Sequence, residues 1–206
     1  MRVSDSYRFV YVHNQKTGGV TMETVLDGAV PDIRGDRPKR HLTLSQILEQ
    51  EPALNDYWIF GVVRNPWARM VSWWSMIHDG VTRAAQGEKG AVKRIQKYPV
   101  WRTVSTYPDF EHFIMKGPAE IPRLGEAQLS RLQTPQRKAD YIGRTETLTD
   151  DIAAILVHLG LPPSKEVPRK NASSHAGTYR DFYTPMTRDR VAELYAPDID
   201  EFGYDF

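Results

Sequence analysis

The segment from Arg8 to Leu26, RFVYVHNQKTGGVTMETVL, constrains the fold of this chain more than any other. Its first part, around Phe9 to Val12, consists of aromatic and β-branched residues and predicts a buried β-strand. The polar break that follows leads into the apolar stripe of a helix, which is formed by Met22, Val25, Leu26 and Ala29. The segment therefore predicts a strand that runs through a glycine pair directly into a helix.

The loop between this strand and this helix has the properties of an anion-binding site. The backbone amides of the loop and of the first helical turn point at one spot, and the helix dipole favours negative charge there. Lys16 adds a positive charge, and Thr17 and Thr21 add hydroxyl donors. We expect the loop to bind a phosphate or a phosphosulfate. A tight turn that carries a solvated lysine remains the alternative.

This loop is not a Walker A motif. In that motif the lysine follows the second glycine, because it reaches back over the phosphates from the helix start. Here Lys16 precedes both Gly18 and Gly19. This motif alone is weak evidence for an anion-binding site, so its interpretation depends on the other motifs of the chain.

Length and composition narrow the class of protein. The chain has 206 residues and 40% hydrophobic residues, which suits one globular domain. Its net charge of +1 gives no global basic field of the kind that nucleic-acid-binding proteins carry. It has no cysteine, which excludes disulfides and thiol catalysis. We expect no signal peptide and no membrane span, and therefore a soluble, cytoplasmic protein.

A second strand–loop–helix unit starts at Tyr57–Val63, whose nearly continuous apolar sequence is typical of a buried parallel strand. Asn65 is a good N-cap and Pro66 a good first helical residue, so a helix should begin there. Basic and hydroxyl side chains should lie on the side of this unit away from the core: Arg64, Arg69 and Ser72. Two such units in one chain suggest two phosphates on one ligand.

The remaining segments complete an alternating pattern of strands and helices. Further elements are expected at Leu44–Leu48, Asp109–Lys116, Tyr141–Gly143, Thr149–Leu159 and Val191–Tyr195. Thr147 and Asp150 should form a capping box. The polar stretch Asp79–Tyr98 is expected to be a mobile loop or a weak helix, suited to a substrate lid. The pattern predicts one α/β domain over residues 1–206, with a P-loop-like parallel sheet flanked by helices and the ligand beyond the strand C-termini.

Together these segments resemble the sulfotransferases that use 3′-phosphoadenosine 5′-phosphosulfate (PAPS), especially the Golgi-type and bacterial family 2 carbohydrate O-sulfotransferases. VHNQKTGGVT is similar to the 5′-phosphosulfate loop of that family. VVRNPWARMVS is similar to its 3′-phosphate motif, with Arg64 and Ser72 at the family's spacing. IGRTETLTDDIAAILVHLGL and the closing segment from RKNASSHAGTYRDFYTP resemble two later blocks.

The resemblance implies a role for each matching position. Lys16 should contact the bridging and 5′-phosphate oxygens and stabilise the leaving phosphate. The 5′-phosphate should be wrapped by Thr17, Gly18, Gly19, Val20 and Thr21. The 3′-phosphate should be held by Arg64 and Ser72, and the loop that closes over the nucleotide should contribute Arg169, Lys170 and Ser173. Val20 stands where the family commonly has threonine, so Thr21 should carry more of the contact.

Sulfuryl transfer also needs a base that removes the proton of the acceptor hydroxyl. We expect His41 to be this base, because histidine titrates near neutrality and related glycan sulfotransferases carry a catalytic histidine between the two nucleotide motifs. Glu23 on the first helix is the alternative, since a glutamate does this work in related groups. His13 should be structural, and Trp73 is a candidate for lining an acceptor pocket.

The resemblance implies PAPS as donor co-substrate, no metal, and an acceptor with a free hydroxyl, most plausibly a carbohydrate. A natural-product alcohol or phenol is the other acceptor class, no nucleic-acid partner is expected, and the sequence does not predict an oligomeric state. Two further functions stay open. One is an ATP-dependent phosphotransferase, and the other is a non-catalytic protein that binds a nucleotide or a glycan.

Overall fold

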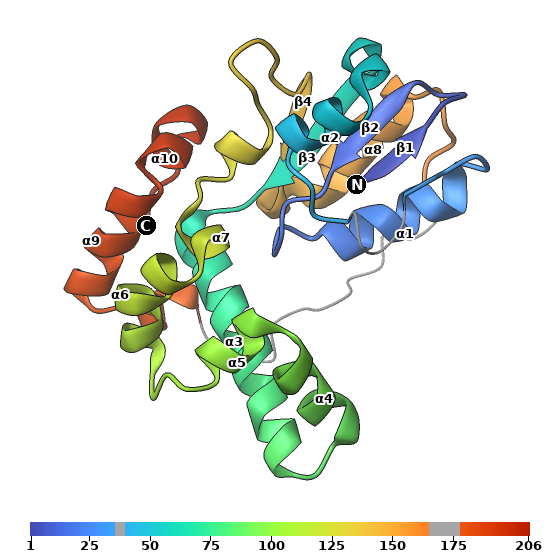
Figure 1. The fold of residues 1–206 in the computed structure, drawn as a ribbon. Coiled ribbons are helices and arrows are strands. Elements are labelled where there is room, and N and C mark those ends of the chain that lie inside the picture. The colour runs from blue at the N-terminus through green and yellow to red at the C-terminus, as the bar shows by residue number, and fades with distance from the viewer. Residues whose placement is uncertain (36–39, 165–177) are drawn as a thin grey trace. The chain divides into compact units, whose positions relative to one another are not determined.

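The computed structural model describes residues 1–35, 40–164 and 178–206 (Figure 1). The chain divides into two compact units. The first consists of Met1–Arg64 and Gln128–Ala172, and the second of Asn65–Ala127 and Ser173–Phe206. Each unit is described by itself below.

The first unit is built on a four-stranded sheet in the order β1-β2-β3-β4. The strands are β1 (Arg2–Ser4), β2 (Phe9–Val12), β3 (Trp58–Val63) and β4 (Tyr141–Arg144). Strands β2, β3 and β4 are parallel, with Val10 opposite Ile59 and Gly61 opposite Ile142. Strand β1, which the sequence pattern did not indicate, pairs antiparallel with β2 at the edge. The predicted parallel sheet is thus confirmed, with one antiparallel edge strand added.

The core of this unit lies between the sheet and the helices α1 (Gly19–Ala29) and α8 (Leu148–His158). All four residues of β2 are buried, as expected for a strand covered on both faces. The rings of Tyr11 and Phe60 pack at 5.3 Å between centroids. Met22 on α1 and Ile155 on α8 are each 1% exposed and belong to the same cluster. The apolar stripes read from the sequence therefore face the sheet.

The N-terminal caps of α2 (Leu44–Gln50) and α8 in the first unit differ from each other. Helix α2 begins with a capping box between Thr43 and Gln46. The capping box predicted for Thr147 and Asp150 at the start of α8 is wrong. The Thr147 hydroxyl instead donates to Asp151 at 2.7 Å, and the same carboxylate accepts the backbone N–H of Arg144 at 2.9 Å. Asp151 therefore ties α8 to the end of β4.

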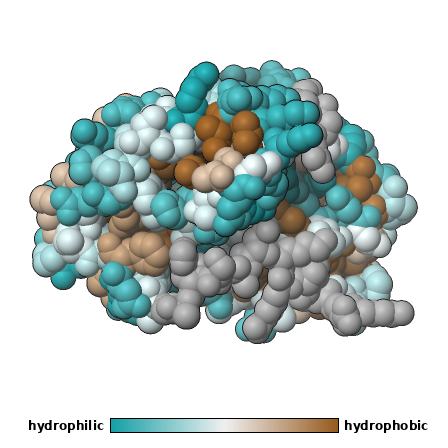
Figure 2. Space-filling model, turned by 90° about the horizontal axis from the view of Figure 1, so that it is seen from below, coloured by the Kyte–Doolittle hydropathy of each residue, from teal (hydrophilic) through white to brown (hydrophobic). Residues whose placement is uncertain are grey.

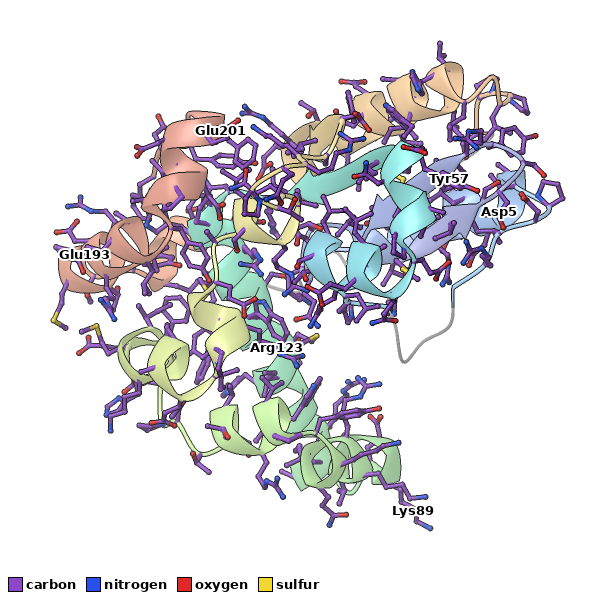
Figure 3. The ribbon with its side chains drawn as sticks, turned by 45° about the horizontal axis from the view of Figure 1, so that its top comes forward. Asp5, Tyr57, Lys89, Arg123, Glu193 and Glu201 are labelled. Carbon is purple, nitrogen blue, oxygen red and sulfur yellow. The ribbon has the colours of Figure 1, made fainter. Side chains whose placement is uncertain are left out.

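Short 3-10 turns and surface contacts connect these elements. The turns are η1 (Pro52–Asp56), η2 (Leu129–Arg131) and η3 (Thr145–Thr147). Asp5, after β1, accepts a hydrogen bond from the Tyr57 hydroxyl at 3.0 Å, next to the start of β3 (Figure 3). Arg34 pairs with the same Asp5 carboxylate at 3.1 Å. These contacts hold the edge strand to its neighbours.

The second unit is helical. Its helices are α3 (Pro66–Ala85), α4 (Lys89–Lys97), α5 (Pro99–Val104), α6 (Phe110–Glu120), α7 (Pro122–Gly125), α9 (Pro185–Leu194) and α10 (Ala196–Phe202), with the 3-10 turn η4 (Tyr179–Phe182). The long helix α3 starts as predicted, because the Asn65 side chain accepts the N–H of Ala68 at 3.2 Å and Pro66 occupies the first turn.

One expectation for this unit is decided and another needs correction. Of the two possibilities for Asp79–Tyr98, a mobile loop or a weak helix, the structure shows helix, formed by the end of α3 and by α4. Arg69 was expected on the solvent side of α3, but it is 2% exposed. Its guanidinium donates to the Tyr195 hydroxyl at 3.4 Å and lies over the Tyr195 ring. The helical period alone does not predict this, because η4 and α9 also pack against α3 and Tyr195 contacts Arg69.

Figure 2 shows one face of the molecule, where patches of hydrophobic side chains alternate with hydrophilic ones. Within the described ranges, no helix combines the length and the apolar character that crossing a bilayer requires.

Candidate active site

The loop after β2 is tightly wound and closes on itself. Lys16 and Gly18 both have left-handed backbone conformations, with φ of 69° and 77°. The buried Thr17 hydroxyl donates to the carbonyl oxygen of Asn14 at 2.9 Å. Helix α1 then starts where the Gly18 carbonyl accepts the N–H of Thr21 at 2.9 Å. Because its hydroxyl is used inside the loop, Thr17 offers a bound anion only its backbone N–H.

The glycine pair is required by close packing on both sides. A Cβ on Gly18 would lie 2.6 Å from Cδ2 of Leu148, and one on Gly19 would lie 1.9 Å from Nε2 of His13. The loop is therefore fixed between α8 and the His13 ring. Helix α1 has no side-chain cap and no acidic residue in its first turn. Its first backbone N–H groups and its dipole consequently favour an anion at this end.

Two positive side chains adjoin this helix end. Nη1 of Arg64, which follows β3, donates to the carbonyl oxygen of Lys16 at 3.4 Å. Burial, followed by the charge of Arg64, lowers the pKa of Lys16 to about 8. A bound anion would relieve this repulsion between like charges, which is a property expected of a phosphate site.

Gln128 fixes the ends of β2 and β3 and was not predicted as part of the site. It is fully buried. Its side chain accepts the Arg64 N–H at 2.9 Å and donates to the Arg64 carbonyl at 2.7 Å. Its own carbonyl accepts from the Asn14 side chain at 3.4 Å. Gln128 has no local motif, since its partners lie 64 and 114 positions away in the chain.

Glu23 on α1 is buried and forms a cluster with the buried His13 and the part-buried Arg40. Nδ1 of His13 donates to Oε1 of Glu23 at 3.0 Å, and Nε of Arg40 donates to the same oxygen at 3.0 Å. A second, shorter bond joins Arg40 to Oε2. Burial alone would raise the pKa of Glu23, but the hydrogen bonds from His13 and Arg40 lower it to about 2. Both carboxylate oxygens are therefore engaged, which the sequence did not indicate.

His41 lies directly against this cluster. Its ring meets the His13 ring edge to face at 4.7 Å, and its Nδ1 lies 3.4 Å from the His13 carbonyl oxygen. Arg131 donates to the His41 carbonyl oxygen at 2.5 Å and fixes the backbone there. Burial, and next the neighbouring His13, lower the pKa of His41 to about 3. When Nδ1 donates to the His13 carbonyl, Nε2 carries the lone pair that can accept a proton.

The structure brings some of the predicted residues together and leaves others apart. In the first unit, the loop residues Lys16 to Thr21 adjoin Arg64, and His41 reaches the loop through His13, whose ring packs on Gly19. Ser72 lies half-buried on α3 in the second unit. The predicted closing residues lie outside the described residues: Arg169, Lys170 and Ser173.

Two further expectations concern metals and the acceptor pocket. Among the described residues, no group of three histidine, aspartate or glutamate side chains is arranged so that it could hold a metal ion. Trp73, expected near the acceptor, is buried in the second unit and 3% exposed. A small cavity in that unit is lined instead by its neighbour Trp74 with Ile77 and His78.

The comparisons with known proteins give this site its context. The family model described as "Sulfotransferase family" matches residues 1–205. The chain belongs to the sulfotransferase family. Among solved structures, the crystal structure of mouse sulfotransferase SULT7A1 complexed with PAP is similar, with a TM-score of 0.52 and 11% sequence identity. The match covers 96% of this chain and 86% of that chain, and it confirms the α/β fold. A search of curated proteins found no match.

Proposed function

We propose that this sulfotransferase moves a sulfonate group from PAPS to an acceptor hydroxyl. The observation that carries the proposal is the convergence of Lys16, Arg64 and the uncapped N-terminus of α1 at one end of the sheet. Family membership supports the reaction class. The nucleotide in the similar mouse structure, PAP, supports PAPS as the donor, because PAP is what remains after PAPS has lost its sulfonate.

The chemistry is an in-line displacement at sulfur. The acceptor oxygen forms a bond to sulfur while the bond between sulfur and the bridging phosphate oxygen breaks. The electron pair of that bond leaves with PAP, and the acceptor proton passes to a base. Lys16 stabilises the charge that develops on the leaving 5′-phosphate. The amides of Thr17, Gly18, Gly19 and Val20 and the Thr21 hydroxyl bind its other oxygens.

The 3′-phosphate is assigned to Arg64 and Ser72, following the family motif. Its charge distinguishes this nucleotide from ADP and ATP. Arg169, Lys170 and Ser173 are assigned to closure over the bound nucleotide. These roles rest on the matching sequence positions, and Arg64 is additionally supported by its bond to the Lys16 carbonyl.

We assign the base to His41 and a positioning role to Glu23. The pKa of about 3 keeps His41 neutral at pH 7, as a base must be, but it also makes the ring a weaker proton acceptor than an ordinary imidazole. The assignment therefore rests on the family resemblance. Glu23, by contrast, already holds His13 and Arg40 with both oxygens. It therefore orients the His13 ring, against which His41 packs.

The acceptor is proposed to be a carbohydrate hydroxyl, on the basis of the family resemblance, with an alcohol or phenol as the alternative. We also infer that residues 1–206 work as one catalytic domain, because the family match extends over both units. A metal-free reaction and a cytoplasmic location remain predictions.

The proposal is tested by incubating the protein with PAPS and a panel of sugars, polysaccharides and phenols, and measuring PAP release. We expect acceptor-dependent release that Lys16→Ala reduces by about 10² or more, since it removes a charge from the transition state. Transfer of phosphate from ATP to the same acceptors would favour the phosphotransferase. Tight PAP binding without any turnover would favour the non-catalytic alternative.

A further inference from the structure

The segment Gln128–Leu132, which includes the turn η2, forms a brace that contacts three separate parts of the candidate site. The brace and its partners all belong to the first unit. Its partners Asn14, Arg64 and His41 lie 114, 64 and 90 positions away in the chain. They belong to the loop after β2, to the end of β3 and to the turn before α2. One short segment therefore holds parts of the site that are far apart in the sequence.

The brace is anchored on the sheet. Leu132 is fully buried, and a Cβ added at Gly61 of β3 would lie 2.3 Å from its Cδ2. The Leu132 N–H donates to the carbonyl of the buried Leu129 at 2.9 Å, and its own carbonyl accepts the Ala139 N–H at 2.8 Å. Because close packing leaves little room for movement, the side chains of the brace extend from a fixed backbone.

The side chain of Gln128 takes the place of a neighbouring strand for Arg64, the first residue after β3. Its carboxamide accepts the Arg64 N–H at 2.9 Å and donates to the Arg64 carbonyl at 2.7 Å. A carboxamide offers a carbonyl acceptor and an N–H donor next to each other, as a backbone peptide group does. The backbone of Arg64 is therefore held beyond the last residue of the strand.

The backbone of Gln128 holds the loop after β2 as well. Its carbonyl accepts from Nδ2 of Asn14 at 3.4 Å, and the Asn14 carbonyl accepts the Thr17 hydroxyl at 2.9 Å. All three residues are fully buried, where a lost hydrogen bond leaves an unsatisfied polar group. Since this contact uses the Gln128 backbone, it should survive replacement of the side chain.

Arg131 holds the proposed base. Its Nη2 donates to the His41 carbonyl oxygen at 2.5 Å. His41 lies in a turn and not in a helix or strand, so tertiary contacts have to fix its backbone. The His13 ring meets the His41 ring at 4.7 Å, which leaves the backbone to Arg131. Because hydrogen bonds from charged donors are stronger than neutral ones, Arg131 constrains the place of His41 strongly.

We propose that Gln128 and Arg131 are positioning residues of the transfer reaction. Gln128 places Arg64 for the 3′-phosphate of the donor, and Arg131 places His41 for the proton of the acceptor. The inference rests on the proposed function, to which it adds two residues that act through others. Misplacing a reacting group by about 1 Å can cost about 10² in rate. Loss of Gln128 should therefore change donor selectivity, whereas loss of Arg131 should change turnover.

Gln128 is tested by calorimetric titration with PAP and with AMP, which lacks the 3′-phosphate. Gln128→Met removes both hydrogen bonds to Arg64, and Gln128→Glu keeps the acceptor and loses the amide donor. We expect both variants to bind PAP about 10-fold more weakly and AMP within about twofold of wild type. In an Arg64→Ala background, Gln128→Met should not reduce the preference for PAP further. Gln136→Met, at an exposed glutamine nearby in the sequence, is the matched control.

Arg131 is tested by the rate of PAP release from PAPS. Arg131→Met should lower kcat by about 10-fold and leave PAP affinity within about twofold, because it misaligns the base and not the donor. Arg131→Lys keeps a charged donor and should restore part of the rate. In a His41→Ala background, Arg131→Met should change kcat less than about twofold. Arg123→Met, at an exposed arginine on α7 (Figure 3), is the control.

Urea denaturation checks that each variant folds, and the second variant at each position serves where the first does not. Equal losses of PAP and AMP binding in the Gln128 variants would overturn the role of Gln128. A further fall in kcat when Arg131→Met is added to His41→Ala would overturn the role of Arg131.

Failure of the proposed function can be told apart from failure of the brace. Wild-type protein that neither binds PAP nor releases it from PAPS would refute the proposed function. The hold of Arg131 on His41 is then judged from the NMR signals of the His41 ring. Arg131→Met should shift these signals, and Arg123→Met should not. Unshifted signals in Arg131→Met would overturn the inference.

Discussion

Nη1 of Arg64 donates a hydrogen bond to the carbonyl oxygen of Lys16 at 3.4 Å, so the basic residues of two separate strand ends adjoin each other. Parallel pairing of β2 with β3 places both strand ends at one edge of the sheet. Gln128 then fixes Arg64 through both backbone polar groups. This arrangement holds two positive charges at the N-terminus of α1, where a phosphate is favoured.

Donor binding should depend on the protonation of Lys16. Its pKa of about 8 in the free protein means that the charge is lost as the pH rises through 8, while a bound phosphate favours the protonated form. The dissociation constant of PAP should therefore increase above pH 8, and binding at pH 8.5 should take up a proton. Calorimetry in buffers with different ionisation enthalpies measures this uptake. Lys16→Arg should shift the pH dependence upward, and an unshifted profile would contradict the assignment.

Substitution by alanine at the two glycines of α1 should change the free energy of unfolding in opposite directions. Gly19→Ala introduces a Cβ 1.9 Å from His13 Nε2 and should lower the free energy of unfolding by about 1–3 kcal/mol. A Cβ added at Gly28 would meet no atom within 4 Å. Gly28→Ala should therefore raise the free energy of unfolding by up to about 1 kcal/mol. Urea denaturation compares the two. Equal effects at both positions would mean that His13 does not pack on Gly19.

Removing the proposed base should reduce turnover without weakening donor binding. His41→Ala should lower kcat by about 10²–10⁴, while PAP affinity stays within about threefold. His112→Ala is the control, since His112 is exposed on α6 and pairs with Asp109. Because the pKa of His41 is about 3, the base should remain active between pH 7 and 5. A rate that falls with an apparent pKa near 6.5 as the pH is lowered, or full activity in His41→Ala, would argue against His41 as the base.

Protonation of His41 at low pH should destabilise the fold. His41 has a folded-state pKa far below the ordinary value of 6.5, so its contribution to stability is complete above pH 6.5 and is lost as the pH falls toward 3. The wild-type free energy of unfolding should fall more steeply with acid than that of His41→Gln, by up to about 1.4 kcal/mol per pH unit. Parallel curves for the two proteins would show that the imidazole is not buried in its neutral form.

The features that were predicted correctly from the sequence depend on local rules. The transition from β2 through the glycines into α1, and the Asn65–Pro66 start of α3, depend on neighbouring residues and were found where expected. Gln128 and Arg40 act on partners far away in the chain, through topology that no local period encodes. Arg69 was misplaced for the same reason, since its partner Tyr195 lies 126 positions later.

The central claim is that the two motifs bind a 3′-phosphorylated nucleotide. It is tested most directly by calorimetric titration of the purified protein with PAP, with ADP and ATP as controls, on wild type, Lys16→Ala and Ser72→Ala. The account predicts that PAP binds selectively, that Lys16→Ala loses the 5′-phosphate contact, and that Ser72→Ala reduces the preference for PAP over ADP. A wild-type protein that binds ATP as tightly as PAP, or that binds no nucleotide, would contradict it.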